Sequence, residues 1–184
     1  MKSLKKWHFY AFIIIVILGS LFHFIYQWSN NNAFIGLFGA VNESTWEHLK
    51  LLFWPTLFLA LIGYFSFGKR YPQYFYATLC SILIGIATIV IIFYTYTGII
   101  GKNFLIMDII TFIIGVGVSQ YVSYRLLNKS INNVLTINYI SIVVIALLII
   151  LFINFTFNPL HIPLFKDPIS GRYGVPFYIF IKRL

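Results

Sequence analysis

The chain has 184 residues, of which 60% are hydrophobic and only 9% are charged, whereas ordinary globular proteins carry about 25% charged residues. A water-soluble protein of this length could not hide so much apolar surface, so the composition excludes a soluble domain and predicts an integral membrane protein. The net charge is +9, but the lysines and arginines are scattered at the ends of apolar segments. This scatter excludes a nucleic-acid-binding protein, which needs one contiguous basic face.

The predicted elements are five transmembrane helices. Each is long enough to cross about 30 Å of hydrocarbon, which takes about 20 residues. The start of the chain is similar to a signal peptide, but its apolar region is too long and predicts a retained first helix. Prolines and charges exclude a sixth span, and we expect residues 177–182 to lie along the membrane surface. The expected fold is an all-α, polytopic transmembrane helix bundle that forms one domain over residues 1–184. The spans are roughly 8–28, 45–67, 73–98, 104–125 and 134–157, followed by an irregular C-terminal tail, 158–184.

Lysine and arginine residues in the short loops predict the orientation of the bundle. One side carries Lys2, Lys5, Lys6, Lys69, Arg70, Arg125 and Lys129, whereas the loops of the other side carry only Lys102. We therefore expect a cytoplasmic N-terminus and an extracytoplasmic tail, although basic residues in the tail reduce the asymmetry.

This topology places the rare ionisable side chains on one side of the membrane. All four acids of the chain and three of its four histidines map to the outer side: His23, Glu43, Glu47, His48, Asp108, His161 and Asp167. His8 is expected to be an interfacial residue on the other side, and the inner half of the spans is expected to be nearly all apolar. Ionisable groups are costly in a membrane and mark functional sites there.

Imidazoles and carboxylates without thiols suit zinc or a similar divalent metal. The candidate ligands are His23, His48, Asp108 and His161. Glu47 or Glu43 is the candidate general base, and Ser44 is a candidate substrate or supporting contact. The segment lacks the H-E-x-x-H pattern that places two histidines on one helix face.

Each of these residues also has a purely structural interpretation. Ser44 and Glu47 have the spacing of a capping box, in which each side chain bonds the other's backbone amide. His23 could simply bond a neighbouring helix, and His161, between two prolines, could be an ordinary loop residue. The capping box explains neither Glu43 nor His48.

Four stretches carry a resemblance to a known family: "SLFHFIYQWS", "LFGAVNESTWEHLKLLFWP", "FYTYTGIIGKNFLIMDI" and "HIPLFKDPISGRYG". The chain resembles a family of short bacterial multi-pass membrane proteins that has no assigned function. The resemblance covers nearly the whole chain, and the N-E-S-x-W-E-H block is its most specific part. It implies a bacterial plasma-membrane protein and implies no catalytic residue.

Three kinds of function remain open from the sequence. The first is a metal-dependent membrane enzyme, a hydrolase or transferase, acting on a lipid or lipid-linked substrate at the outer membrane face. The second is a non-enzymatic protein that binds a cation or small polar ligand, or a transporter subunit. The third is a purely structural or partner-binding membrane protein, in which the polar cluster holds helices together. Transporters have inverted repeats or broken helices at the midplane, and the sequence shows neither.

Overall fold

The computed structural model describes residues 2–175, so the expected surface segment at 177–182 lies outside the described residues. Within that range the chain is helical apart from its loops and one isolated β-bridge between Lys166 and Tyr173. The elements are α1 (Lys2–Trp28), α2 (Ala33–Gly36), α3 (Thr45–Ser66), η1 (Gly68–Arg70), α4 (Tyr74–Ile100), α5 (Leu105–Leu127), α6 (Val134–Phe157) and η2 (Pro163–Phe165).

The five long helices confirm the expected all-α polytopic bundle, because each is long and apolar enough to cross a membrane. Their bounds differ from the expected ones mainly at the start, where α1 begins at Lys2 rather than at residue 8. Residues 2–7 contain no helix breaker, and lysine side chains can extend from a helix end toward water. α1 ends where Asn30 and Asn31 adopt left-handed backbone conformations, which asparagine tolerates better than most residues.

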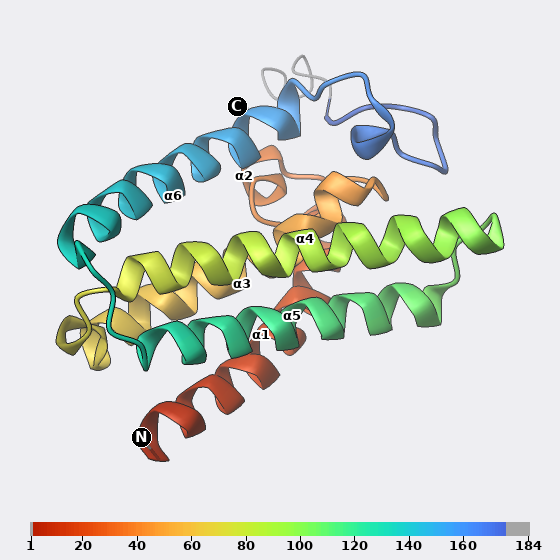
Figure 1. The fold of residues 1–184 in the computed structure, drawn as a ribbon. Coiled ribbons are helices and arrows are strands. Elements are labelled where there is room, and N and C mark those ends of the chain that lie inside the picture. Colours follow the sequence, from red (N-terminus) through yellow and green to blue (C-terminus); the bar gives the residue numbers. More distant parts are fainter. Residues whose placement is uncertain (1, 176–184) are drawn as a thin grey trace.

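The helices surround α3, which is the most buried of the five. α6, α4, α5 and the first half of α1 lie in that order across the molecule, and α4 and α5 run side by side along its length (Figure 1). Phe53 of α3 is fully buried and stacks on Phe152 of α6 at a ring-centroid distance of 4.3 Å. The outer faces of the helices expose large apolar side chains, as a lipid-facing surface requires.

Glycines allow α4 and α5 to pack closely. A Cβ atom on Gly85 would lie 3.2 Å from the carbonyl oxygen of Gly115, and one on Gly115 would lie 3.2 Å from that of Gly85. Small residues commonly allow such approach between membrane helices. Gly101 ends α4 with φ 81°, a left-handed conformation that suits glycine.

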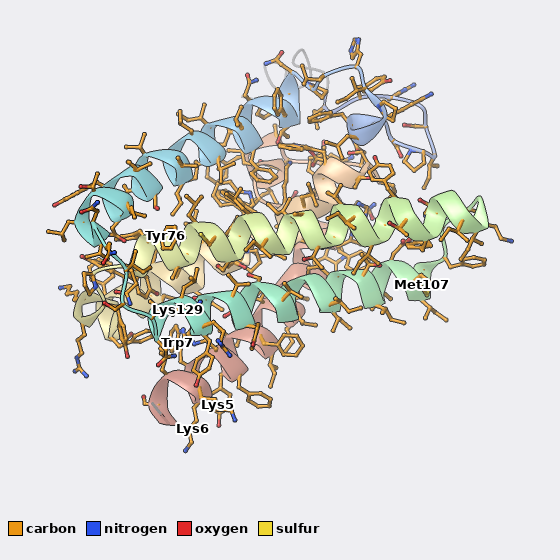
Figure 2. The ribbon with its side chains drawn as sticks, viewed as in Figure 1. Lys5, Lys6, Trp7, Tyr76, Met107 and Lys129 are labelled. Atoms are coloured by element: carbon orange, nitrogen blue, oxygen red, sulfur yellow. The ribbon has the colours of Figure 1, made fainter. Side chains whose placement is uncertain are left out.

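The two ends of the bundle differ in charge. The basic end carries Lys5 and Lys6 of α1, the pair Lys69 and Arg70, and the residues that follow α5. Figure 2 shows Lys5, Lys6 and Lys129 far from Met107, which lies in the first turn of α5 at the other end. That other end, the acidic end, holds the end of α1, the starts of α3 and α5, the ends of α4 and α6, and all four acids.

Candidate functional site

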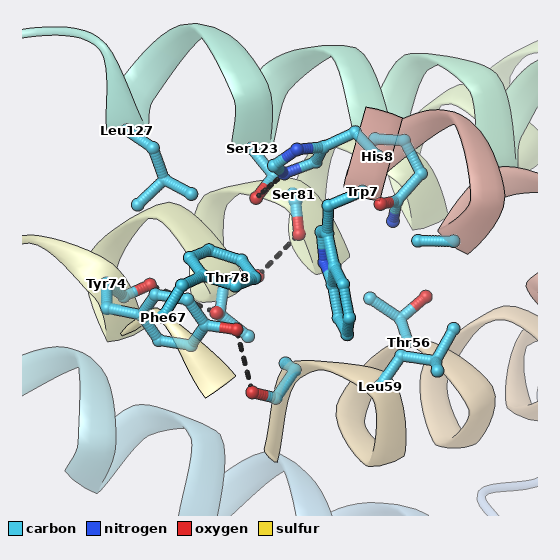
Figure 3. Close-up of a pocket in the computed structure, with 13 residues that line it drawn as sticks. Trp7, His8, Thr56, Leu59, Phe67, Tyr74, Thr78, Ser81, Ser123 and Leu127 are labelled. Atoms are coloured by element: carbon cyan, nitrogen blue, oxygen red, sulfur yellow. Dashed lines mark hydrogen bonds between the residues drawn. The ribbon is translucent and has the colours of Figure 1, made fainter. Parts of the chain in front are cut away.

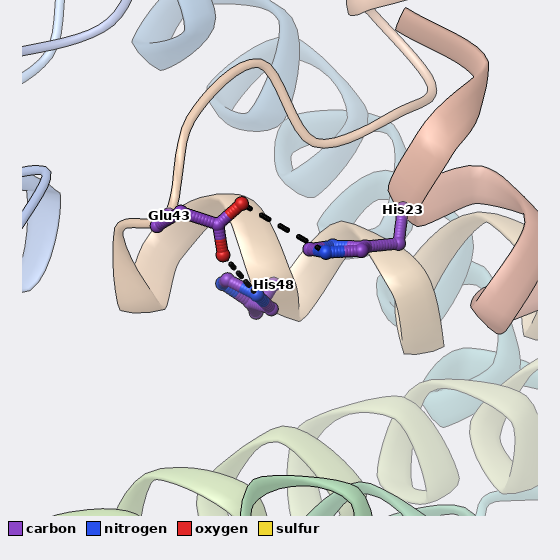
Figure 4. Close-up of side chains that lie close together, drawn as sticks. All are labelled: His23, Glu43 and His48. Atoms are coloured by element: carbon purple, nitrogen blue, oxygen red, sulfur yellow. Dashed lines mark ion pairs between the residues drawn. The ribbon is translucent and has the colours of Figure 1, made fainter. Parts of the chain in front are cut away.

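Three side chains from separate parts of the chain meet at the acidic end: His23 near the end of α1, Glu43 in the loop before α3, and His48 in the first turn of α3 (Figure 4). One ligand atom from each lies within 4.8 Å of the other two. His48 Nε2 lies 3.4 Å from Glu43 Oε2, and His23 Nε2 lies 3.8 Å from Glu43 Oε1. We call these three residues the His23–Glu43–His48 cluster.

The close crossing of α1 and α3 brings the two histidines together. A Cβ atom on Gly19 would lie only 2.6 Å from the carbonyl oxygen of Leu51. Pro55 lies four residues after Leu51 and has no amide hydrogen. It therefore cannot donate the usual helical hydrogen bond to the Leu51 carbonyl. The helices are antiparallel, so His23 and His48 each lie about one turn from this crossing on its acidic side. Their ring centroids are 5.1 Å apart.

The loop that carries Glu43 is held against both helices. The amide of Ala40 donates to the Phe22 carbonyl of α1 at 3.2 Å, next to His23 in the chain. The amide of Val41 donates to the Glu47 carboxylate of α3 at 3.0 Å. Glu43 follows two residues later and therefore lies in the short segment between these anchored residues and the Ser44 cap of α3.

His48 has a defined tautomer. Its Nδ1 lies 2.9 Å from the Ser44 carbonyl oxygen, which can only accept, so Nδ1 carries a hydrogen. In the neutral ring Nε2 is then an acceptor, yet it faces the Glu43 carboxylate, another acceptor. Two facing acceptors repel each other, so this arrangement favours either a shared proton, which would make His48 an imidazolium, or a metal ion between the two atoms.

The charge state of Glu43 suits either cation. Its hydrogen bond with His48 holds the pKa of the Glu43 carboxyl below the ordinary value, although partial burial acts in the opposite direction. The side chains of His23, His48 and Glu43 are 26%, 35% and 36% exposed. The cluster is therefore anionic at its carboxylate and open on one side.

These three donors fit a divalent metal. Zinc bonds of about 2.0–2.2 Å in tetrahedral geometry separate ligand atoms by about 3.3 Å. The His48–Glu43 distance of 3.4 Å is close to this value, whereas the His23–Glu43 distance of 3.8 Å is wider, so His23 would move closer on binding a metal. Two imidazoles and one carboxylate are a known donor set of catalytic zinc sites, which leave the fourth position open. Ser44 orients His48 through its carbonyl, as second partners of metal-binding histidines do. Nδ1 of His23 is enclosed and has no hydrogen-bond partner in the described part of the chain.

Glu47 is not positioned as a free base. It is 2% exposed and its Oε2 lies 2.6 Å from Lys50 Nζ. Only half of the predicted capping box forms: the Ser44 hydroxyl accepts the Glu47 amide at 3.4 Å, but the Ser44 amide donates to Asn42. The Glu47 carboxylate bonds Val41 instead, because Lys50 on the same helix face and the overlying loop enclose it.

Asp108 and His161 lie outside the cluster. The Asp108 carboxylate accepts hydrogen bonds from the Tyr96 hydroxyl at the end of α4 and from Asn103, at 3.3 Å. It is near enough to His48 to interact with it electrostatically. His161 is exposed in the tail and packs against Tyr173, with ring centroids 4.6 Å apart. Of the four expected metal ligands, the structure brings together His23 and His48, with Glu43 in place of the other two.

The tail closes over the loop of Glu43. Trp46 of α3 packs against Phe165 of η2 at 4.8 Å between ring centroids and stacks on Phe152 at 4.6 Å. Burial alone would raise the pKa of Asp167, but hydrogen bonds from Ser170, Ile169 and the Glu43 backbone hold it below its ordinary value. The tail therefore contacts the backbone of the residue that completes the cluster.

Comparison with known proteins gives a family and no activity. Residues 1–175 match the model of the family of unknown function DUF6512. The chain belongs to the DUF6512 family. No curated protein and no solved structure matches it. The match confirms the expected membership of a family of unknown function that spans nearly the whole chain. For this DUF6512 protein, any function must therefore be argued from the geometry at the acidic end.

Lys50 is not among the residues expected from the sequence to have a functional role. It is a completely buried lysine that bonds the Gly36 carbonyl at 2.9 Å as well as Glu47. A signal was available, because Lys50 lies inside an apolar span three residues after Glu47, a spacing that places both on one helix face. In this DUF6512 protein the pair fixes the loop from which Glu43 reaches the histidines.

Proposed function

We propose that this protein is a membrane enzyme, a hydrolase or transferase, that uses a divalent metal such as zinc on a lipid or lipid-linked substrate. The observation that carries the proposal is the His23–Glu43–His48 cluster, in which an acceptor nitrogen of His48 faces a carboxylate 3.4 Å away. A metal ion satisfies both atoms and would leave an open position on the exposed side of the cluster.

Held by His23, Glu43 and His48, a metal would supply a water of lowered pKa and a Lewis acid for the substrate's carbonyl or phosphoryl oxygen. Glu43 serves as a ligand in this assignment and not as the base. Glu47 is paired with Lys50, and Asp167 is bonded within its own turn. Asp108, held by Tyr96 and Asn103 near His48, is therefore assigned as the general base.

The location of the cluster supports a substrate in the membrane. It lies at the end of the bundle, where headgroups meet water, and large apolar side chains near it face outward, among them Phe24, Trp28 and Leu105. Basic residues gather at the opposite end, so the positive-inside rule assigns the cluster and the tail to the outer face and the N-terminus to the cytoplasm. With the expected bacterial origin, the membrane is the plasma membrane.

A second candidate is a protein that binds a cation or small polar ligand without turnover. The observation in its favour is that both carboxylate oxygens of Asp108 already accept a hydrogen bond, one from Tyr96 and one from Asn103, and so are engaged within the protein. Transport has less support, because all four acids lie at one end of the bundle and none lies along the helices toward the basic end.

Metal analysis of the purified protein tests the proposal. We expect about one zinc per chain in detergent solution, loss of that zinc in His48→Ala and Glu43→Gln, and retention in the matched control His161→Ala. A wild-type protein that binds no zinc, cobalt or manganese at micromolar concentration would overturn the proposed metal site.

Turnover separates the two candidates. The zinc-loaded protein is incubated with ester-linked and phosphodiester-linked lipids, and the released products are measured by mass spectrometry. We expect the wild type to turn over one of these lipids. We expect the turnover rate of Asp108→Asn to be at least 100-fold lower with the metal retained, because loss of a general base lowers the rate by about this factor. Metal binding without turnover on either class supports the binding protein instead.

A further inference from the structure

The basic half of the bundle contains a polar cavity that the proposed function does not use. It lies where α1, α3, α4 and α5 meet and has a volume of about 20 Å³ (Figure 3). Its polar lining comes from all four helices: His8, Thr56, Thr78, Ser81, Gln120 and Ser123. The expectation that this half of the spans is nearly all apolar is therefore wrong. His8, expected at the interface, is buried at 7% exposure.

Thr56 has an unsatisfied hydroxyl in this cavity. Its side chain is 4% exposed, and its Oγ1 is buried without a hydrogen-bond partner among the described residues. Thr78, Thr88 and Thr156 bond the carbonyl four residues earlier at 2.7–3.0 Å, whereas Thr56 shares its lack of a partner among the described residues with Thr111, which does not line the cavity. A buried polar group without a partner is costly and points to a ligand.

Two further groups face the same space. His8 Nδ1 donates to the Leu4 carbonyl at 2.9 Å, so the neutral ring accepts the Ser123 hydroxyl at Nε2, at 3.1 Å. The Ser123 oxygen then keeps its acceptor capacity. Gln120 is 8% exposed and lines the cavity, and its amide offers both donors and an acceptor.

The size and charge of the cavity limit the ligand. A water molecule needs about 10–15 Å³ of such space, so 20 Å³ holds one and excludes larger molecules. Among the described residues that line the cavity there is no carboxylate to balance a cation and no lysine or arginine to balance an anion. We infer that the cavity is a binding site for one water molecule, held by Thr56, Gln120 and Ser123.

This water would connect helices that have few other polar links in the basic half. Thr56 lies on α3, Gln120 and Ser123 lie on α5, and Ser123 continues the network to His8 on α1. A buried water that makes about three hydrogen bonds is costly to remove. The site therefore stabilises the packing of α1 and α3 on α5 and does not depend on the metal.

Methyl NMR on the full chain in lipid nanodiscs tests the inference. With labelled alanine methyls, we expect a strong water cross-relaxation peak at Ala11, which lines the cavity, and a weaker one or none at Ala77, which is fully buried behind the lining residues Tyr74 and Leu127. Thr56→Val and Gln120→Leu should each weaken the Ala11 peak at least threefold. The control Thr88→Val, which removes a hydroxyl bonded within α4, should leave it unchanged.

Either of two results would overturn the water site. One is a folded wild-type protein with no water peak at Ala11. The other is an Ala11 peak that both variants leave unchanged. Because the readout is made on the wild type first, failure of one variant to fold does not remove the test.

Discussion

Lys50 Nζ lies 2.6 Å from Glu47 Oε2, and both side chains are almost completely buried, at 0% and 2% exposure. The ammonium also bonds the Gly36 carbonyl, and the carboxylate also accepts the Val41 amide. The pair therefore joins α3 to Gly36 and to Val41, at two points of the segment that precedes Glu43. A buried pair contributes little net stability compared with apolar residues, but loss of one partner leaves an uncompensated charge.

We expect Lys50→Met to destabilise the protein by about 3–5 kcal/mol, because it leaves Glu47 charged and buried. The double variant Lys50→Met, Glu47→Gln should recover much of that loss, since it removes both charges. Thermal unfolding in detergent measures both. If the double variant were as unstable as the single one, the loss would come from packing and not from the charge of Glu47.

The crossing of Gly19 and Leu51 predicts a second effect. Gly19→Ala places a Cβ atom against the Leu51 carbonyl, a backbone atom that can move only with its helix. We expect a cost of about 1–3 kcal/mol from overpacking and at least a 10-fold loss of zinc affinity, because His23 and His48 separate. Gly98→Ala is the matched control, since nothing lies within 4 Å of a Cβ atom there. Equal zinc affinity in the two variants would contradict the positioning role of the crossing.

The lowered pKa of Glu43 leads us to expect that the stability of the metal-free protein depends on pH. The folded pKa of Glu43 is lower than its ordinary value because of the hydrogen bond with His48. The stabilisation is therefore complete above the unfolded pKa, about 4.3 for glutamate, and is lost as pH falls through the lower folded pKa. The difference in unfolding temperature between wild type and Glu43→Gln should shrink between about pH 5 and pH 3. A difference that stays constant over this range would show that the carboxylate charge is not involved.

The ring contacts of Trp46 are expected to hold the C-terminal tail against α3 and α6. Trp46 contacts Phe152, Phe155 and Phe165 with ring centroids 4.6–5.3 Å apart. Trp46 is partly buried, so we expect Trp46→Ala to cost no more than about 3–5 kcal/mol, which is the loss for a fully buried aromatic side chain, and to speed tryptic cleavage at Lys166 and Arg172. Trp28→Ala is the control, because Trp28 is 66% exposed. Unchanged cleavage in Trp46→Ala would show that the tail is held by other contacts.

The sequence by itself determined the five spans and the gathering of every acid at one end of the bundle. Both depend on local properties: the length of each apolar run, which must match the bilayer, and the position of a charge along its own helix. The Ser44 cap is local too, because it joins residues three positions apart. The position of each residue along the chain is therefore enough to predict these features.

Only the tertiary structure decided which of the gathered side chains meet. Glu43 reaches His23 and His48 because a glycine lets α1 approach α3 and because Lys50 and Glu47 fix the loop between them. Asp108 turns to Tyr96 instead, and His161 stays exposed. The polar cavity depends on a contact between His8 and Ser123, 115 positions apart. Such pairings depend on which faces of distant helices pack together, and hydropathy and local spacing carry no information on that choice.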